Sequence, residues 1–118
     1  MLFRVFSGGK FFDFSVFRVG FFMQFIGLMF SRRKTAVRLF SYSRDNYVPI
    51  HSWFVFYNFL IVWLDSKNKI VEWRVVRPFT SIILPRKKCR AFLEIPIDDK
   101  YSRELNFVVG NKQRFKYN

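Results

Sequence analysis

Lysine and arginine are the residues of this chain whose number and spacing point most clearly to a chemistry. They gather in three short clusters flanked by aromatic residues: Arg32, Arg33, Lys34 and Arg38; Arg86, Lys87, Lys88 and Arg90; Lys112, Arg114 and Lys116. Such side chains bind phosphate groups, and arginine adds bidentate hydrogen bonding and stacking. The clusters therefore indicate RNA binding, if folding brings them onto a connected surface. A solvated charged face is the alternative explanation.

The charge of the whole chain supports the same interpretation. Its 118 residues include 21 Lys and Arg against 8 Asp and Glu, which gives a formal net charge of +13. An excess of this size is typical of nucleic-acid-binding domains, and it repels itself unless a polyanion neutralises it. A basic protein without such a partner, or one that binds an anionic membrane surface, is the alternative.

Residues that catalyse reactions or bind metals are scarce. His51 is the only histidine, and no recognised motif or ligand spacing surrounds it. We therefore expect no catalytic residue, no metal, no cofactor and no enzymatic activity. A small-ligand or enzymatic pocket near His51, completed by Asp65 or Glu94, is the alternative that the sequence leaves open.

Cys89 is the only cysteine, so it has no disulfide partner within the chain. The neighbouring Lys88 and Arg90 would lower the pKa of a thiol that lay close to them. Without a second cysteine or a nearby histidine, a structural thiol is the favoured interpretation. The lack of a disulfide framework suits a reducing, cytoplasmic environment.

The apolar stretch from Phe11 to Phe30 is about as long as a membrane-spanning helix. It contains Asp13, Arg18 and Gln24, and a charge near the middle of a span is costly. We therefore expect no transmembrane span.

The elements that must position these residues are predicted to be short β-strands around one central hairpin. The run Phe59 to Leu64 is continuously apolar, as in a strand covered on both faces. A polar turn, Asp65 to Lys69, joins it to Ile70 to Val76. The alternation of the second arm places Val71, Trp73 and Val75 on one face, with Glu72 and Arg74 on the other.

Shorter elements are predicted on both sides of this hairpin. Further strands are expected at Leu2–Phe6 and Phe12–Val16, which form a hairpin across Ser7–Lys10, and at Val37–Phe40, Thr80–Leu84, Ala91–Ile95, Asn106–Val109 and Gln113–Tyr117. Helical spacing marks Gly20–Phe30, a helical turn is expected at Asp98-Asp99, and Ser41–Pro49 is predicted to be an exposed loop. The fold class expected is mostly β (a β-rich α+β protein): a single basic domain over residues 1–118. It should be a compact barrel-like module of short, mainly antiparallel strands with one or two short helical turns.

A set of short motifs occurs in this order along the chain: Gly27-Leu28-Met29, His51, Phe54, Leu64-Asp65, Leu93-Glu94-Ile95-Pro96 and Val109-Gly110-Asn111. In these motifs the chain resembles a family of small prokaryotic proteins known as domain of unknown function 192. Two positions that are acidic in the family are neutral here, Leu60 and Asn111, so this chain is a basic variant. The resemblance implies a compact, mostly β fold with a barrel-like core and implies no particular reaction.

These observations predict a non-enzymatic RNA-binding protein. A small, compact and basic domain suits a ribosomal or ribosome-associated accessory protein that contacts ribosomal RNA through its Lys and Arg clusters. Its expected partners are ribosomal RNA and the neighbouring ribosomal proteins.

Overall fold

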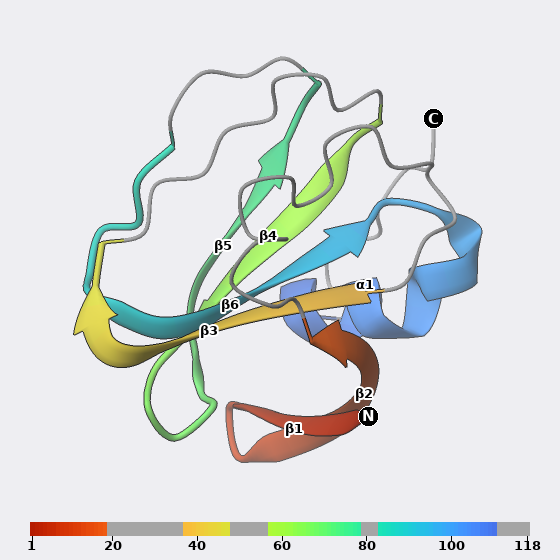
Figure 1. Cartoon of the computed structure of the whole chain (residues 1–118). Coiled ribbons are helices and arrows are strands. Elements are labelled where there is room, and N and C mark those ends of the chain that lie inside the picture. Colours follow the sequence, from red (N-terminus) through yellow and green to blue (C-terminus); the bar gives the residue numbers. More distant parts are fainter. Residues whose placement is uncertain (19–36, 48–56, 79–82, 111–118) are drawn as a thin grey trace.

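Six β-strands form one curled sheet, a half-barrel, in the order β1-β2-β3-β6-β4-β5 (Figure 1). The strands are β1 (Leu2–Ser7), β2 (Lys10–Arg18), β3 (Val37–Asn46), β4 (Phe59–Leu64), β5 (Ile70–Val76) and β6 (Cys89–Pro96). The computed structural model describes residues 1–18, 37–47, 57–78 and 83–110. Within the sheet, β2 and β3 are parallel and the other four neighbouring pairs are antiparallel. The expected mostly β, barrel-like fold is confirmed.

The central hairpin is confirmed with the predicted bounds. All six residues of β4 are buried, because β4 lies between β6 and β5 and is covered on both faces. Its turn is closed by Asp65, whose Oδ1 accepts hydrogen bonds from the backbone N–H groups of Lys67 (2.8 Å) and Lys69 (2.9 Å). Asn68 takes the left-handed conformation (φ 62°) that the turn requires.

The prediction for the two faces of β5 is wrong at one residue. Glu72 lies opposite Trp63 but Ile70 lies opposite Leu64, so Val71 is an extra residue in the ladder. A bulge of this kind shifts the alternation of side chains by one position. Val71 consequently packs on the opposite side of the sheet from Trp73.

The N-terminal hairpin is also confirmed. Ser7 pairs with Lys10, which leaves Gly8 and Gly9 as a two-residue turn. Both glycines have positive φ angles, 57° and 78°, as the favoured tight turn of a hairpin demands. The tip then contacts the central hairpin, because the N–H of Phe6 donates to the carbonyl of Asn68 at 2.9 Å.

Strand β3 is longer than predicted, and the loop expected over Ser41–Pro49 is wrong as far as Asn46. The added part of the strand is polar except for Tyr42, whose side chain is partly buried against Phe92. The ladder with β6 continues to Ser41 and resumes at Asn46, after an irregular stretch. Beyond Leu39, β3 pairs with β6 alone among the described strands. A strand segment that pairs on one side only can carry polar residues, and this polar composition is why the sequence suggested a loop.

The C-terminal strand predicted at Asn106–Val109 is wrong, since these residues belong to helix α1 (Ser102–Val109). The helical turn at Asp98-Asp99 is correct: Asp98 caps the 3-10 helix η2 (Asp99–Tyr101) by accepting from the N–H of Lys100. Leu105 and Val108 recur at helical spacing and are buried. Gly110 (φ 85°) follows the end of the helix.

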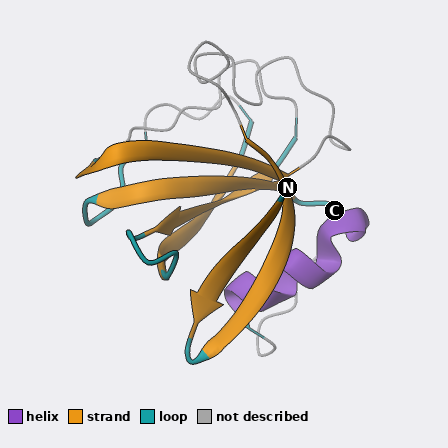
Figure 2. Ribbon diagram, turned by 60° about the horizontal axis from the view of Figure 1, so that its bottom comes forward, coloured by secondary structure: helices purple, strands orange, loops and turns teal. Residues whose placement is uncertain are grey.

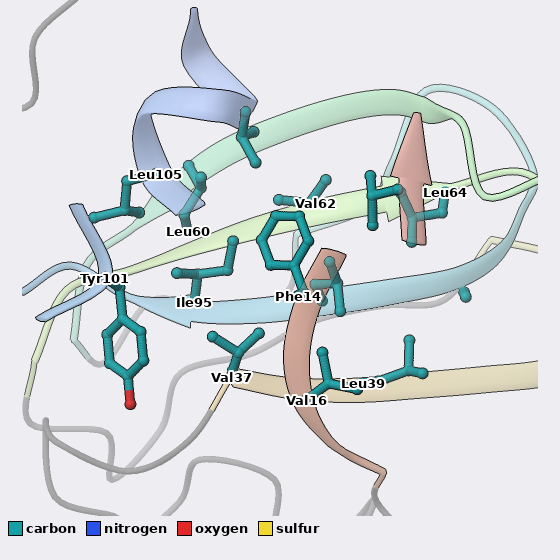
Figure 3. Packing of buried hydrophobic residues seen from close by; sticks show 14 of the residues in the cluster. Phe14, Val16, Val37, Leu39, Leu60, Val62, Leu64, Ile95, Tyr101 and Leu105 are labelled. Atoms are coloured by element: carbon teal, nitrogen blue, oxygen red, sulfur yellow. The ribbon is translucent and has the colours of Figure 1, made fainter. Parts of the chain in front are cut away.

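Two apolar clusters cover the two faces of the sheet. The first contains Leu60, Val62 and Leu64 of β4 with side chains from β1, β2, β3, β6 and α1 (Figure 3). The second contains Phe59, Ile61 and Trp63 with aromatic residues such as Phe40 and Phe92, whose rings stack at 4.6 Å. In β6, Ala91, Leu93 and Ile95 lie in the first cluster, as predicted.

Three predicted elements fall outside the described residues: the helix at Gly20–Phe30, the strand at Gln113–Tyr117 and most of the strand at Thr80–Leu84. Among the described residues, no helix is long and apolar enough to cross a membrane.

Candidate nucleic-acid interface

Basic residues gather where four segments of the half-barrel meet at one end. The tip of the β1–β2 hairpin contacts the β4–β5 turn through Phe6 and Asn68. Leu64, just before that turn, pairs with Ala91 near the start of β6, and Cys89 pairs with Asn46 at the end of β3. In Figure 2 these turns and strand ends lie along the left side and the bottom of the view, and the β1–β2 hairpin at the bottom lies next to helix α1.

We call this end the basic rim. It carries eight cationic side chains: Lys10, Arg44, Lys67, Lys69, Arg86, Lys87, Lys88 and Arg90. Seven of these residues are exposed and Arg90 is partly exposed. Phosphate binding requires cations on a connected, accessible surface, and the rim provides one.

The two carboxylates of the rim already have partners. Asp45 forms an ion pair with Arg90, Nε to Oδ1, at 2.9 Å. Asp65 accepts the backbone hydrogen bonds that close the β4–β5 turn. The lysines of the rim form no ion pair with any described residue, so their charges are available to bind an anionic partner.

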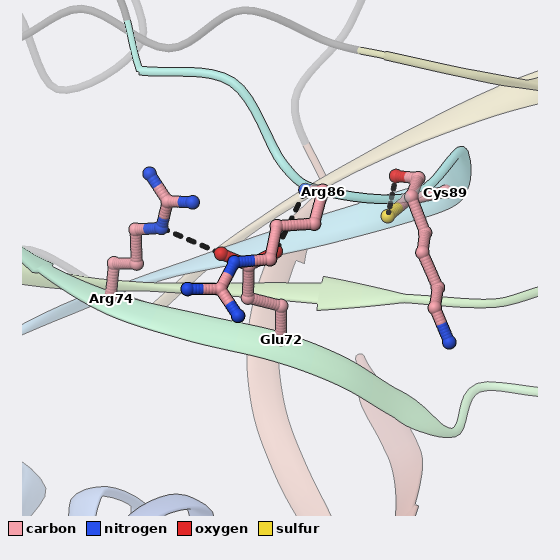
Figure 4. Close-up of polar contacts among 5 residues, drawn as sticks. Glu72, Arg74, Arg86 and Cys89 are labelled. Carbon is pink, nitrogen blue, oxygen red and sulfur yellow. Dashed lines mark hydrogen bonds and ion pairs between the residues drawn. The ribbon is translucent and has the colours of Figure 1, made fainter.

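Glu72 of β5 holds the segment that leads into the rim (Figure 4). Its Oε1 accepts from the backbone N–H of Arg86 at 2.8 Å, and its Oε2 accepts from Nε of Arg74 at 2.6 Å. The bond to Arg86 uses the backbone, so the guanidinium of that residue remains available. The carboxylate therefore positions the cluster at Arg86 without neutralising it.

The predicted clusters are not all brought together. The residues Arg86, Lys87, Lys88 and Arg90 lie in the rim. Arg38 is the second residue of β3 and is half-buried. It pairs with Glu94, whereas the rim lies at the other end of the strand, where Asn46 pairs with Cys89. The predicted residues Arg32, Arg33, Lys34, Lys112, Arg114 and Lys116 lie outside the described residues.

Four cations of the rim were missed by the sequence analysis: Lys10, Arg44, Lys67 and Lys69. Each stands alone or in a short turn, so none forms a run of basic residues. The β1–β2 and β4–β5 hairpins are the two outer pairs of the sheet, so their turns meet only because the sheet curls, and no local pattern marks these residues.

The structure describes two of the three residues of the alternative pocket, Asp65 and Glu94, and these two do not lie together. Asp65 lies in the β4–β5 turn, whereas Glu94 lies in the middle of β6 opposite Ile61. His51 lies outside the described residues. No group of three His, Cys, Asp or Glu in the described part of the chain could hold a metal ion.

Glu94 is nevertheless unusual, because it is 6% exposed on the aromatic side of the sheet. Its Oε2 and the indole Nε1 of Trp63 have no hydrogen-bond partner within the described ranges. Burial raises the pKa of Glu94 to about 8, although the charge of Arg38 opposes this rise. The carboxyl group is therefore mostly protonated at neutral pH.

Cys89 is a structural thiol. It is buried, and Sγ donates to the carbonyl of Lys87 at 3.2 Å (Figure 4). Burial, together with the carboxylates of Glu72, Asp45 and Asp65, raises its pKa to about 11. These effects exceed any lowering by the neighbouring cations, so the thiol is poorly reactive.

Comparison with known proteins identifies the fold. No family model matches the chain, and no curated protein matches it. A solved structure from Sinorhizobium meliloti 1021, described as a putative transcription regulator, matches with a TM-score of 0.70 at 21% identity, over 86% of this chain and 82% of that one. A protein of unknown function from Novosphingobium aromaticivorans DSM 12444 matches with a TM-score of 0.66 at 15% identity, over 85% and 74% of the two chains. The half-barrel is therefore a fold that these two proteins share with this chain.

Proposed function

We propose that this protein is a non-enzymatic RNA-binding protein, and that its basic rim contacts the phosphates of ribosomal RNA. The supporting observation is the gathering of eight cations from four separate segments at one end of the sheet. A charged face that served only solubility would not require this convergence. Phosphate contacts supply most of the affinity of such proteins for nucleic acid.

The distribution of charge along the chain strengthens the proposal. All 8 acidic residues fall within the described ranges, so the segments outside them contain no Asp or Glu, and the two segments 19–36 and 111–118 together contain six Lys and Arg. The predicted RNA-binding residues at 32–34 and 112–116 belong to these segments. The likeness to solved structures concerns the fold alone, so the proposal rests on the rim and on this charge.

A binding assay with a matched control tests the proposal. The probe is a labelled ribosomal RNA hairpin with a single-stranded tail, and anisotropy measures its affinity as KCl rises from about 50 to 200 mM. The rim variant Lys87→Gln/Lys88→Gln removes two exposed charges. The control Arg18→Gln/Lys100→Gln also removes two exposed charges, one at the end of β2 farthest from the hairpin tip and one in η2, beyond the end of β6 opposite the rim.

The rim variant should bind more weakly at every salt concentration. The slope of log affinity against log salt should fall by about 1.5, because each phosphate contact contributes about 0.7 to 0.9. The control variant should keep the slope of the unmodified protein. An affinity that does not respond to salt, or equal losses in both variants, would contradict binding through the rim.

Association with ribosomes is tested separately, by sedimentation of lysate through sucrose gradients at low and high salt. The proposal predicts co-migration with ribosomal particles that weakens at high salt. Migration as a free protein under both conditions would reject the ribosome as the partner. Binding to RNA itself would then be decided by the anisotropy assay.

Small-ligand binding is a second candidate, supported by polar atoms of Glu94 and Trp63 that lie on one face of the sheet and have no hydrogen-bond partner in the described part of the chain. Thermal shift with a panel of small amines and amides tests it, with Glu94→Gln as the variant that should lose any response. RNA affinity should be unaffected by the same substitution.

A further inference from the structure

Two phenylalanines are exposed beside the basic rim, at the tip of the β1–β2 hairpin. Phe6 is 41% exposed and Phe11 is 54% exposed. They are directly opposite each other on the two strands, and their ring centroids are 6.3 Å apart. We call them the Phe6–Phe11 pair.

The pair adjoins cations of the rim on two sides. Phe6 bridges to Lys69 of the β4–β5 turn, in addition to its backbone bond to Asn68. Lys10 directly precedes Phe11 and is exposed. An aromatic surface is thus bordered by lysines that come from two different hairpins.

The surroundings of the pair are preorganised by Arg4. Its guanidinium carbon lies 4.1 Å from the centroid of the Phe11 ring. The same guanidinium binds Asp13 through two hydrogen bonds, of 2.8 and 3.1 Å. The carboxylate on this face of the hairpin is therefore neutralised, and it offers little repulsion to a polyanion.

The two rings lie on the outward face of the hairpin, where Leu2 and Phe17 are also exposed but have no rim cation beside them in the ladder. Val5 and Phe14 point into the first core cluster, so their neighbours along the strands face outward and are expected to be polar. Aromatic rings next to cations are the combination that binds single-stranded nucleic acid, since bases stack on the rings while the cations hold the phosphates.

We propose that the Phe6–Phe11 pair stacks against unpaired bases, so that the rim prefers single-stranded RNA to duplex RNA. This inference rests on the proposed RNA-binding function. Charge complementarity favours RNA over a second copy of the chain, because a second copy would bring the same lysines to the same surface. Duplex RNA would meet the lysines but offers no free base face to the rings.

The test compares two labelled probes, single-stranded oligouridylate and a blunt RNA duplex of equal length. The variant Phe6→Ala/Phe11→Ala removes both rings, and Phe6→Leu/Phe11→Leu keeps apolar side chains that suit a hairpin. The control is Phe17→Leu. Phe17 is 56% exposed and lies near the end of β2 that is farthest from the hairpin tip. Circular dichroism confirms that each variant is folded.

Both pair variants should bind oligouridylate at least about tenfold more weakly, since stacking contributes about 1 to 3 kcal/mol per base. Their affinity for the duplex should change less than about twofold, and the slope with salt should stay constant because no charge is removed. The Phe17→Leu control should bind both probes like the unmodified protein.

Two other outcomes would overturn the inference. Unchanged binding of oligouridylate by the pair variants, with weaker binding by Lys87→Gln/Lys88→Gln, would reject stacking and leave the proposed function standing. A change in sedimentation coefficient without a change in RNA affinity would show that a second copy covers the pair. If the lysine variant also bound both probes normally, the proposed function itself would fail.

Discussion

The basic rim and the interior of the sheet accommodate carboxylates in opposite ways. At the rim, Asp45 and Asp65 are at least partly accessible and each accepts hydrogen bonds from charged or backbone donors. In the interior, Glu94 is buried, and its Oε2 has no partner among the described residues. Glu94 keeps a proton at neutral pH because burial raises its pKa to about 8.

This difference separates the residues that stabilise the fold from those that we propose bind a partner. Exposed charges contribute little to stability because water screens them, so the charged residues of the rim can be changed with little effect on folding. Buried positions contribute much more, since each lost contact leaves a cavity. Substitutions at the rim should therefore change binding and spare stability, and substitutions in the interior should do the reverse.

The largest effect is expected for Leu93→Ala in β6. Leu93 is fully buried between β3 and β4, so its truncation should lower the free energy of unfolding by about 2 to 5 kcal/mol. Urea unfolding followed by circular dichroism measures the loss. The rim variant Lys87→Gln/Lys88→Gln should stay within about 0.5 kcal/mol of the unmodified protein. Equal losses in the two variants would abolish the distinction between the regions.

The second effect concerns Glu94 and depends on pH. The folded pKa, about 8, is raised above the ordinary value of 4.5, so the folded state holds this proton more tightly than the unfolded state. The stabilising contribution is fully present below pH 4.5 and is lost as the pH rises toward 8. Glu94→Gln cannot ionise, so at pH 7 it should be more stable than the unmodified protein by about 3 kcal/mol.

Unfolding curves between pH 5 and 8 check this prediction. The difference in stability between the Glu94→Gln variant and the unmodified protein should grow with pH across this window. Glu104→Gln on helix α1 is the control, and its difference should stay constant. A difference for Glu94→Gln that does not vary with pH would show that the carboxyl group is ionised throughout.

A smaller effect is expected for Asp65→Ala in the β4–β5 turn. The substitution removes the acceptor for the N–H groups of Lys67 and Lys69, which are then left to water. The free energy of unfolding should fall by about 1 kcal/mol. Ser66→Ala, within the same turn, is the control and should have little effect. A loss of stability as large as that of Leu93→Ala would mean that this turn contributes as much to the fold as a buried core residue, which would contradict the distinction between rim and interior.

The sequence predicted the sheet well where burial dominates. The apolar run of β4 and the alternation of β6 follow directly from their cover on two faces. It failed at Asn106–Val109, where a short apolar run fits a strand as well as one face of a helix. It also failed at Val71, since a bulge depends on the pairing of two strands and leaves no mark in one of them.

The candidate interface was predicted only in part. The run at Arg86 is visible in the sequence, whereas Lys10 and Lys69 become its neighbours only because two hairpins meet. The position of Phe6 beside Lys69 has the same origin. Contacts between distant turns depend on the order and curvature of the strands, which a local pattern does not encode.

The smallest effect on stability and the finest test of the rim come from Asp45→Asn. The substitution removes one negative charge and releases Arg90 from its ion pair at 2.9 Å. Because this pair is exposed to solvent, the free energy of unfolding should change by less than about 1 kcal/mol. RNA affinity should rise severalfold at low salt and approach that of the unmodified protein at high salt, where added charges are screened. Asp99→Asn in η2 removes an equal charge beyond the opposite end of β6 and should leave RNA affinity unchanged. An equal gain from both substitutions would mean that RNA responds to net charge alone, and that the rim has no special role.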